Sequence, residues 1–175
     1  MKRMSLLLML AGILLSTLAW PDSSSLGNER GTIWISNSGI VSRGSQLVLC
    51  DGLIPRPGES LGSVSFVIGP LLSGSPQEGG TFSSDGSSFT VIGRCKKQDE
   101  PRGIVFQGTF EGSITWTLLS QDGEKLTFSL TGFIRGTNRR GKRVNGTVTQ
   151  TIVTTRDQLA QGIGHIAEGT VYFGT

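Results

Sequence analysis

Apolar and polar residues alternate in short runs along most of this chain. The clearest runs are residues 113–119 and 125–134, where apolar side chains recur at alternate positions with threonine or serine between them. This pattern predicts strands that bury one face and expose the other. Asp122 and Gly123 lie between the two runs, and Asp-Gly in this setting is a strong signal for a hairpin turn. The two runs are therefore predicted to form an antiparallel hairpin with Trp116 in the core.

Further runs of the same kind predict an all-β fold with about ten strands. Asp85 and Gly86 mark a second, less regular hairpin, and only residues 155–162 have the pattern of a short helical turn. So many short strands in one domain predict either a β-sandwich or a closed β-barrel. Their uneven lengths favour a single antiparallel sandwich, with the barrel as the alternative. The predicted strands are residues 32–36, 46–50, 63–68, 81–83, 88–92, 104–110, 113–119, 125–134, 144–154 and 170–173.

The first nineteen residues depart from this pattern. Lys2 and Arg3 give a positive start, and an almost unbroken apolar run follows from residue 5 to residue 18. Thr17 and Ala19 provide the small side chains that a signal peptidase needs before its cleavage site. The run is too short and has the wrong flanks for a stable membrane span. We therefore predict a secretory signal peptide, and a mature protein that is periplasmic or extracellular and has no membrane span.

Removal of residues 1–19 also changes the charge of the chain. The 175 residues include 16 lysines and arginines against 13 acidic residues, and the predicted leader contains two of the basic ones. The mature chain is then close to neutral, which gives no reason to expect nucleic acid as a partner. Residues 20–30 are polar and serine-rich and are predicted to form a flexible N-terminal segment. Residues 31–175 are predicted to be one all-β domain.

Two cysteines, Cys50 and Cys95, remain in the mature chain. An even number of cysteines in an exported protein predicts a disulfide bond. Closing a loop of this length stabilises a fold by about 4 kcal/mol on the chain-entropy model. The alternative is a pair of buried free thiols. With a single histidine elsewhere in the chain, the sequence indicates no metal site and no cofactor.

Five cations form the one local concentration of charge. They are Arg135, Arg139, Arg140, Lys142 and Arg143. We expect them at the turn between two predicted strands, where arginine is suited to bidentate contacts with phosphate, sulfate or carboxylate groups. The alternative is a solvated hairpin tip that prevents edge-to-edge pairing. No aromatic residues are interleaved with the cations, so the cluster does not indicate nucleic acid.

Two further motifs resemble catalytic or phosphate-binding loops. Residues 58–62 match G-x-S-x-G, and Asp157 and His165 follow in the order of a hydrolase triad. Residues 136–143 approach a P-loop, but Arg143 replaces the required serine or threonine. Both motifs need a helix immediately after the loop, whereas each is followed by a predicted strand. We expect both to be ordinary glycine-rich turns.

A row of threonines and two aromatic residues are further candidates for the surface of the domain. Thr147, Thr149 and Thr151 are predicted to lie on one face of a strand, which is typical of the solvent-exposed face of a sheet. Trp34 and Tyr172 are either core residues or platforms on which sugar rings stack. The sequence leaves both alternatives open.

Residues 112–150 contain the patches GSITWTLL, LTFSLTGFIRGT and VNGTVTQ. In these patches the chain resembles a loose group of exported bacterial proteins built from Gly/Thr-rich β domains. The resemblance implies a bacterial exported β domain and offers no activity. With the loop of residues 135–143 as the contact surface, we expect a non-enzymatic binding or structural module whose partner is a carbohydrate or an anionic polymer of the cell envelope.

Two other functional classes stay open at this point. The first is a small secreted glycan-active enzyme, whose acidic groups would come from residues such as Asp51, Glu59 and Glu111. The second is a small outer-membrane β-barrel, since the mature chain is long enough for eight strands. Against the barrel, the predicted apolar faces lack aromatic girdles.

Overall fold

The structure is a computed structural model that describes residues 30–50, 61–97, 100–138 and 141–174. The predicted signal peptide and nearly all of the predicted N-terminal segment lie outside these ranges. The described residues form ten strands and one short helix. The elements are β1 (Gly31–Ser36), β2 (Gly39–Cys50), β3 (Leu61–Ile68), β4 (Leu71–Ser75), β5 (Gly79–Phe82), β6 (Ser88–Lys97), β7 (Glu100–Asp122), β8 (Lys125–Asn138), β9 (Arg143–Thr155), α1 (Arg156–Ala160) and β10 (Ile163–Gly174).

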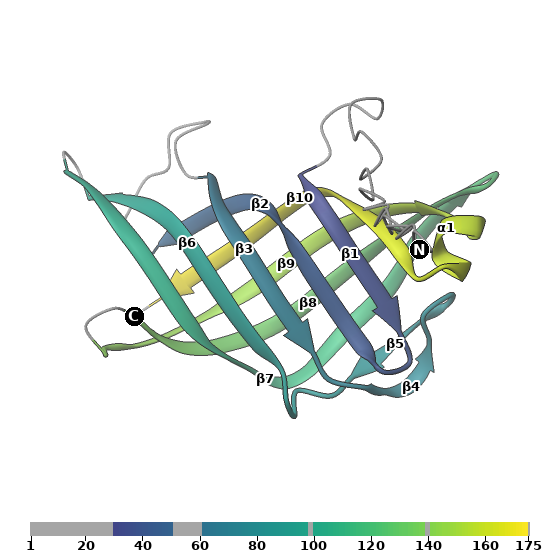
Figure 1. Ribbon diagram of the computed structural model, residues 1–175, viewed down its shortest axis with the longest axis horizontal. Helices are drawn as coiled ribbons and strands as arrows, with labels where there is room; N and C mark the ends of the chain where they lie inside the picture. Colours follow the sequence, from purple (N-terminus) through teal and green to yellow (C-terminus); the bar gives the residue numbers. More distant parts are fainter. Residues whose placement is uncertain (1–29, 51–60, 98–99, 139–140, 175) are drawn as a thin grey trace, which may run out of the picture.

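Eight of the strands close into an antiparallel β-barrel (Figure 1). Around the ring their order is β7, β6, β3, β2, β1, β10, β9 and β8, and β8 pairs with β7 again. The all-β class is therefore confirmed. Of the two architectures that the pattern left open, the structure has the closed barrel and not the favoured sandwich.

The length of β7 explains the closure. Residues 104–110 and 113–119 were predicted as separate strands, but they belong to one strand of 23 residues. Residues 100–108 of β7 pair with β6, and residues 106–122 pair with β8. Register shifts between Glu111 and Thr115 and between Leu118 and Ser120 allow the strand to bend. By pairing with both β6 and β8, the bent strand β7 closes the sheet into a ring.

The β4–β5 hairpin lies beside the ring. β5 pairs with the second part of β7, and β6 pairs with the first part, so β5 and β6 do not pair with each other. The predicted hairpin at Asp85 and Gly86 is therefore wrong, and these residues form the connection between two strands that share β7. The indole Nε1 of Trp116 donates a hydrogen bond of 2.9 Å to the Pro76 carbonyl, which joins the hairpin to the core.

Strand β1 is inserted into a fork between β2 and β10. Residues 32–34 of β1 pair with residues 163–165 of β10, while all of β1 pairs with β2. Beyond the start of β1, residues 47–50 of β2 pair directly with residues 170–173 of β10 in parallel. The Arg30 amide donates to the Ile166 carbonyl at 2.8 Å, at the point where the fork begins.

The interior of the barrel is the hydrophobic core. Trp116 and Phe128 stack with their ring centroids 4.5 Å apart, which confirms the prediction of a buried Trp116. At one end, α1 begins with a capping box formed by Thr155 and Gln158, and Leu159 is buried in the core. The predicted helical turn is thus confirmed. Figure 1 shows α1 and the β4–β5 hairpin at the same end of the barrel.

Candidate functional site

Two cations of the predicted cluster, Lys142 and Arg143, lie at the turn between β8 and β9. Asn138 shapes the turn, because its Oδ1 accepts from the Lys142 amide at 3.0 Å and its carbonyl accepts from the Gly141 amide at 2.9 Å. Lys142 and Arg143 are both exposed. Arg139 and Arg140 lie outside the described residues, so their part in the cluster stays a prediction.

Arg135 differs from the other described cations of the cluster. It lies on the outer face of β8, where its Nη1 forms an ion pair of 2.8 Å with Glu111 Oε1 on β7. Both side chains are about half exposed. The pair fixes the orientation of the guanidinium and offsets part of its charge. It also occupies the only described member of the three carboxylates considered for catalysis, since Asp51 and Glu59 lie outside the described residues.

Two exposed aromatic residues lie in one row across three strands. Phe133 on β8 and Tyr172 on β10 both pair with Thr147 on β9, and all three side chains lie on the outer face. Phe133 is 66% exposed and Tyr172 is 41% exposed. Since neighbouring strands are about 4.8 Å apart, the two aromatic positions are separated by about 10 Å.

A hollow of about 780 Å³ adjoins this row. It is open to solvent and is lined by residues 84–88 and 109–112, which supply hydroxyl groups and the carboxylates of Asp85 and Glu111. Glu111 pairs in register with Phe133, so the hollow and the aromatic row meet at this residue. We call the row of Glu111, Phe133, Thr147 and Tyr172 the outer strip.

Threonines and serines surround the outer strip on one side. The predicted threonine row of β9 lies on the outer face, with Thr149 and Thr151 beside Thr147. The structure adds what the sequence alone did not indicate, namely that Thr131 on β8 and Thr170 on β10 flank Thr149. The hydroxyl groups therefore form a field that extends over several strands.

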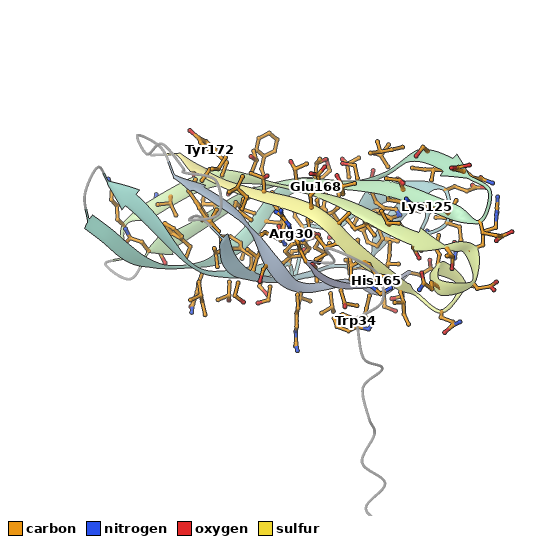
Figure 2. All side chains as sticks on the ribbon, turned by 90° about the horizontal axis from the view of Figure 1, so that it is seen from above. Arg30, Trp34, Lys125, His165, Glu168 and Tyr172 are labelled. Atoms are coloured by element: carbon orange, nitrogen blue, oxygen red, sulfur yellow. The ribbon has the colours of Figure 1, made fainter. Side chains whose placement is uncertain are left out.

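The opposite side of the barrel has a different character. Figure 2 shows Tyr172 on one side and Trp34 with His165 on the other. Trp34 is 39% exposed, which decides against a place in the core. Ile163 and Val41 are its register partners on β10 and β2, and Val67 on β3 continues the row. This side is a continuous row of apolar side chains, in contrast to the alternation of aromatic and hydroxyl groups on the outer strip.

The two motif lookalikes have no catalytic setting. The segment at residues 136–143 leads into strand β9, and the single described helix is the five-residue α1, so neither motif is followed by the helix that it requires. Ser60 lies outside the described residues. Asp157 is exposed on α1, and His165 lies with its Nε2 3.3 Å from Nε2 of Gln158.

Among the described residues, no three histidine, cysteine, aspartate or glutamate side chains are grouped so that they hold a metal ion. Within the same ranges, no helix combines the length and apolar character needed to cross a bilayer. Cys50 and Cys95 lie on β2 and β6, but their side chains are outside the described part, so the disulfide stays a prediction.

Comparisons with protein-family models, with curated proteins and with solved structures find no match. The barrel and its surfaces are therefore the basis for a functional conclusion.

Proposed function

We propose that this protein is an exported, non-enzymatic module that binds a carbohydrate polymer bearing anionic groups. The observation that carries the proposal is the outer strip, where two exposed aromatic rings flank a threonine and the row ends at a polar hollow. Exposed Lys142 and Arg143 lie at the turn that ends the same pair of strands. Aromatic faces, hydroxyl groups and cations are thus available to one extended ligand.

Each part of this surface matches a part of such a ligand. The apolar face of a sugar ring stacks on an aromatic side chain, here Phe133 or Tyr172. Sugar hydroxyl groups exchange hydrogen bonds with threonine hydroxyls and with the carboxylates of the hollow. Sulfate, phosphate or carboxylate groups pair with lysine and arginine. A shallow, open surface of this kind favours binding over catalysis, because water weakens the electrostatic interactions that stabilise a transition state.

Export is part of the same proposal. The N-terminal sequence has the three regions of a signal peptide, and envelope polysaccharides are met outside the cytoplasm. An oxidising compartment would also allow Cys50 and Cys95 to form their predicted disulfide.

The test is retention of the mature protein on immobilised dextran sulfate, with uncharged dextran as the reference matrix. The variant Lys142→Ser/Arg143→Ser removes two exposed cations from the turn of β8 and β9. We expect binding at least tenfold weaker, a loss of about 1.4 kcal/mol. The salt concentration at which the variant elutes should fall accordingly, since exposed charge pairs are screened by salt.

A matched control is available in the same two strands. Lys125→Ser/Arg156→Ser removes two exposed cations next to the opposite ends of β8 and β9 and changes the net charge equally. Retention of this control variant should fall much less. Equal losses in the two variants would show that only net charge matters, and unchanged retention of Lys142→Ser/Arg143→Ser would overturn the proposal. Glu111→Gln should strengthen retention, because it releases Arg135 from its ion pair.

A further inference from the structure

Charged residues are divided unequally between the two ends of the barrel. Figure 1 shows α1 and the β4–β5 hairpin at one end, and the β6–β7 hairpin with the turn of β8 and β9 at the other. The end with α1 has more exposed acidic than basic residues, namely Glu78, Asp122, Glu124 and Asp157 against Lys125 and Arg156. At the other end the sequence places Arg94, Lys96, Lys97 and Arg102 in the β6–β7 hairpin and Lys142 and Arg143 at the turn. A nearly neutral domain thus has one basic end.

The β6–β7 hairpin extends past the strands on either side of it. The pairing of β3 with β6 reaches Ile92, and the pairing of β8 with β7 reaches Phe106. Within the described ranges, residues 93–97 and 100–104 therefore pair only with each other. Five residues of strand extend about 17 Å. The ring does not need this extension, because β7 already pairs with β6 at residues 105–108.

The register of this hairpin leaves its positive charges unbalanced. Arg94 is opposite Gly103 and Lys96 is opposite Pro101, so neither has an acidic residue across from it. Like charges so close together repel one another. Charges on unpaired strand edges also prevent edge-to-edge pairing, but that role does not require a single sign, because edge glutamate serves it as well as lysine. The excess of one sign therefore favours an anionic partner.

The hairpin and the turn of β8 and β9 are close enough for one ligand. Gly103, opposite Arg94, is three residues along β7 from Phe106, which is opposite Asn138. Three residues along a strand and two strand spacings across it separate the backbones of Arg94 and Asn138 by about 14 Å. Asn138 shapes the turn that carries the two exposed cations. An extended polymer can bridge this distance, whereas a single sulfate or phosphate group cannot.

We propose that the β6–β7 hairpin is a second cationic arm of the polysaccharide site. One anionic chain lies across both arms, and it contacts Arg94 and Lys96 on the hairpin and Lys142 and Arg143 on the turn. Two linked contacts bind more tightly than either alone, because the second is made at a high effective concentration. The inference rests on the proposed function and restricts the ligand to a polymer that is long enough to reach both arms.

Acetylation of lysines tests the contact on the unaltered protein. The mature protein is treated with an acetylating ester with and without dextran sulfate, and mass spectrometry gives the rate at each lysine. Dextran sulfate should slow the modification of Lys96 and Lys142 at least fivefold and that of Lys125, which is exposed at the opposite end, less than twofold. Protection of Lys142 without Lys96 would overturn the second arm and leave the proposed function in place. Protection of neither would overturn both.

The variant Arg94→Ser/Lys96→Ser removes two cations of the hairpin. Its retention on dextran sulfate should be at least tenfold weaker, while Lys125→Ser/Arg156→Ser, with the same net charge, should lose much less. Equal losses in the two variants, or unchanged retention of the hairpin variant, would contradict the second arm. Sedimentation velocity adds a check on edge protection, because self-association of the hairpin variant with undiminished retention would show that the cations only keep strand edges apart. The acetylation result decides the matter even where the variant does not fold.

Discussion

The inner and outer faces of β8 and β9 follow opposite rules, and each face has a few exceptions. The inner face is apolar, with Phe128 fully buried against Trp116, except for Gln150 and Thr154. The outer face consists mainly of hydroxyl-bearing and charged residues, and its most exposed apolar side chain is Phe133, which is 66% exposed. Burial explains the residues that obey the rules and does not explain Gln150 and Phe133. Exceptions of this kind are where functional requirements are expected to override folding requirements.

The largest effect is expected on the inner face. Phe128→Ala removes the ring that stacks on Trp116 and leaves a cavity in the core. The free energy of unfolding should fall by about 3–5 kcal/mol, which urea denaturation measures directly. A loss below about 1 kcal/mol would contradict the assignment of this face to the core.

A smaller effect is expected at Gly169, where the inner face lacks a side chain. Gly169→Ala places a methyl group against Gln46, and the resulting displacement should cost about 1–3 kcal/mol of unfolding free energy. In a Gln46→Ala background the methyl group has room, so the same change should cost less than about 0.5 kcal/mol. Additive effects in this double-mutant cycle would show that the amide does not lie over Gly169.

The smallest effect on stability is expected at Phe133. Phe133→Ala should change the free energy of unfolding by no more than about 0.5 kcal/mol, because the ring is exposed. Retention on dextran sulfate should nevertheless decrease, while Phe133→Tyr keeps the ring and should retain binding. Leu119→Ala, at another exposed apolar residue of the barrel, serves as the control and should bind normally. A loss of stability comparable to that of Phe128→Ala would remove the contrast between the two faces.

Local features of the fold were predictable from the sequence. The hairpin at Asp122 and Gly123, the buried Trp116 and the helical turn that became α1 each depend on residues close together in the chain. The choice between sandwich and barrel was not local. It depends on the bend of β7, because the bent strand pairs with β6 along its first part and with β8 along the rest and so closes the ring. The alternation of apolar and polar residues within a single strand does not indicate which strands will become its neighbours.

The candidate site was predictable to a similar extent. The turn position of Lys142 and Arg143 was predictable, because the run of cations lies between two predicted strands. Recognising it does not require knowing which strands pair with each other. The ion pair of Arg135 and the alignment of Phe133 with Tyr172 depend on the register of three strands.

The fork at β1 has a consequence for how the barrel forms. It joins the beginning of the domain to its end, and across it the contact between Ser42 and Gln150 spans 108 positions. Contacts between residues so far apart in the sequence form slowly, because a long loop must be closed before they contribute any stability. The ring therefore closes only after β10 is available to pair with β1, β2 and β9. A chain that is still being synthesised, or that is passing through a narrow pore, cannot form the complete barrel.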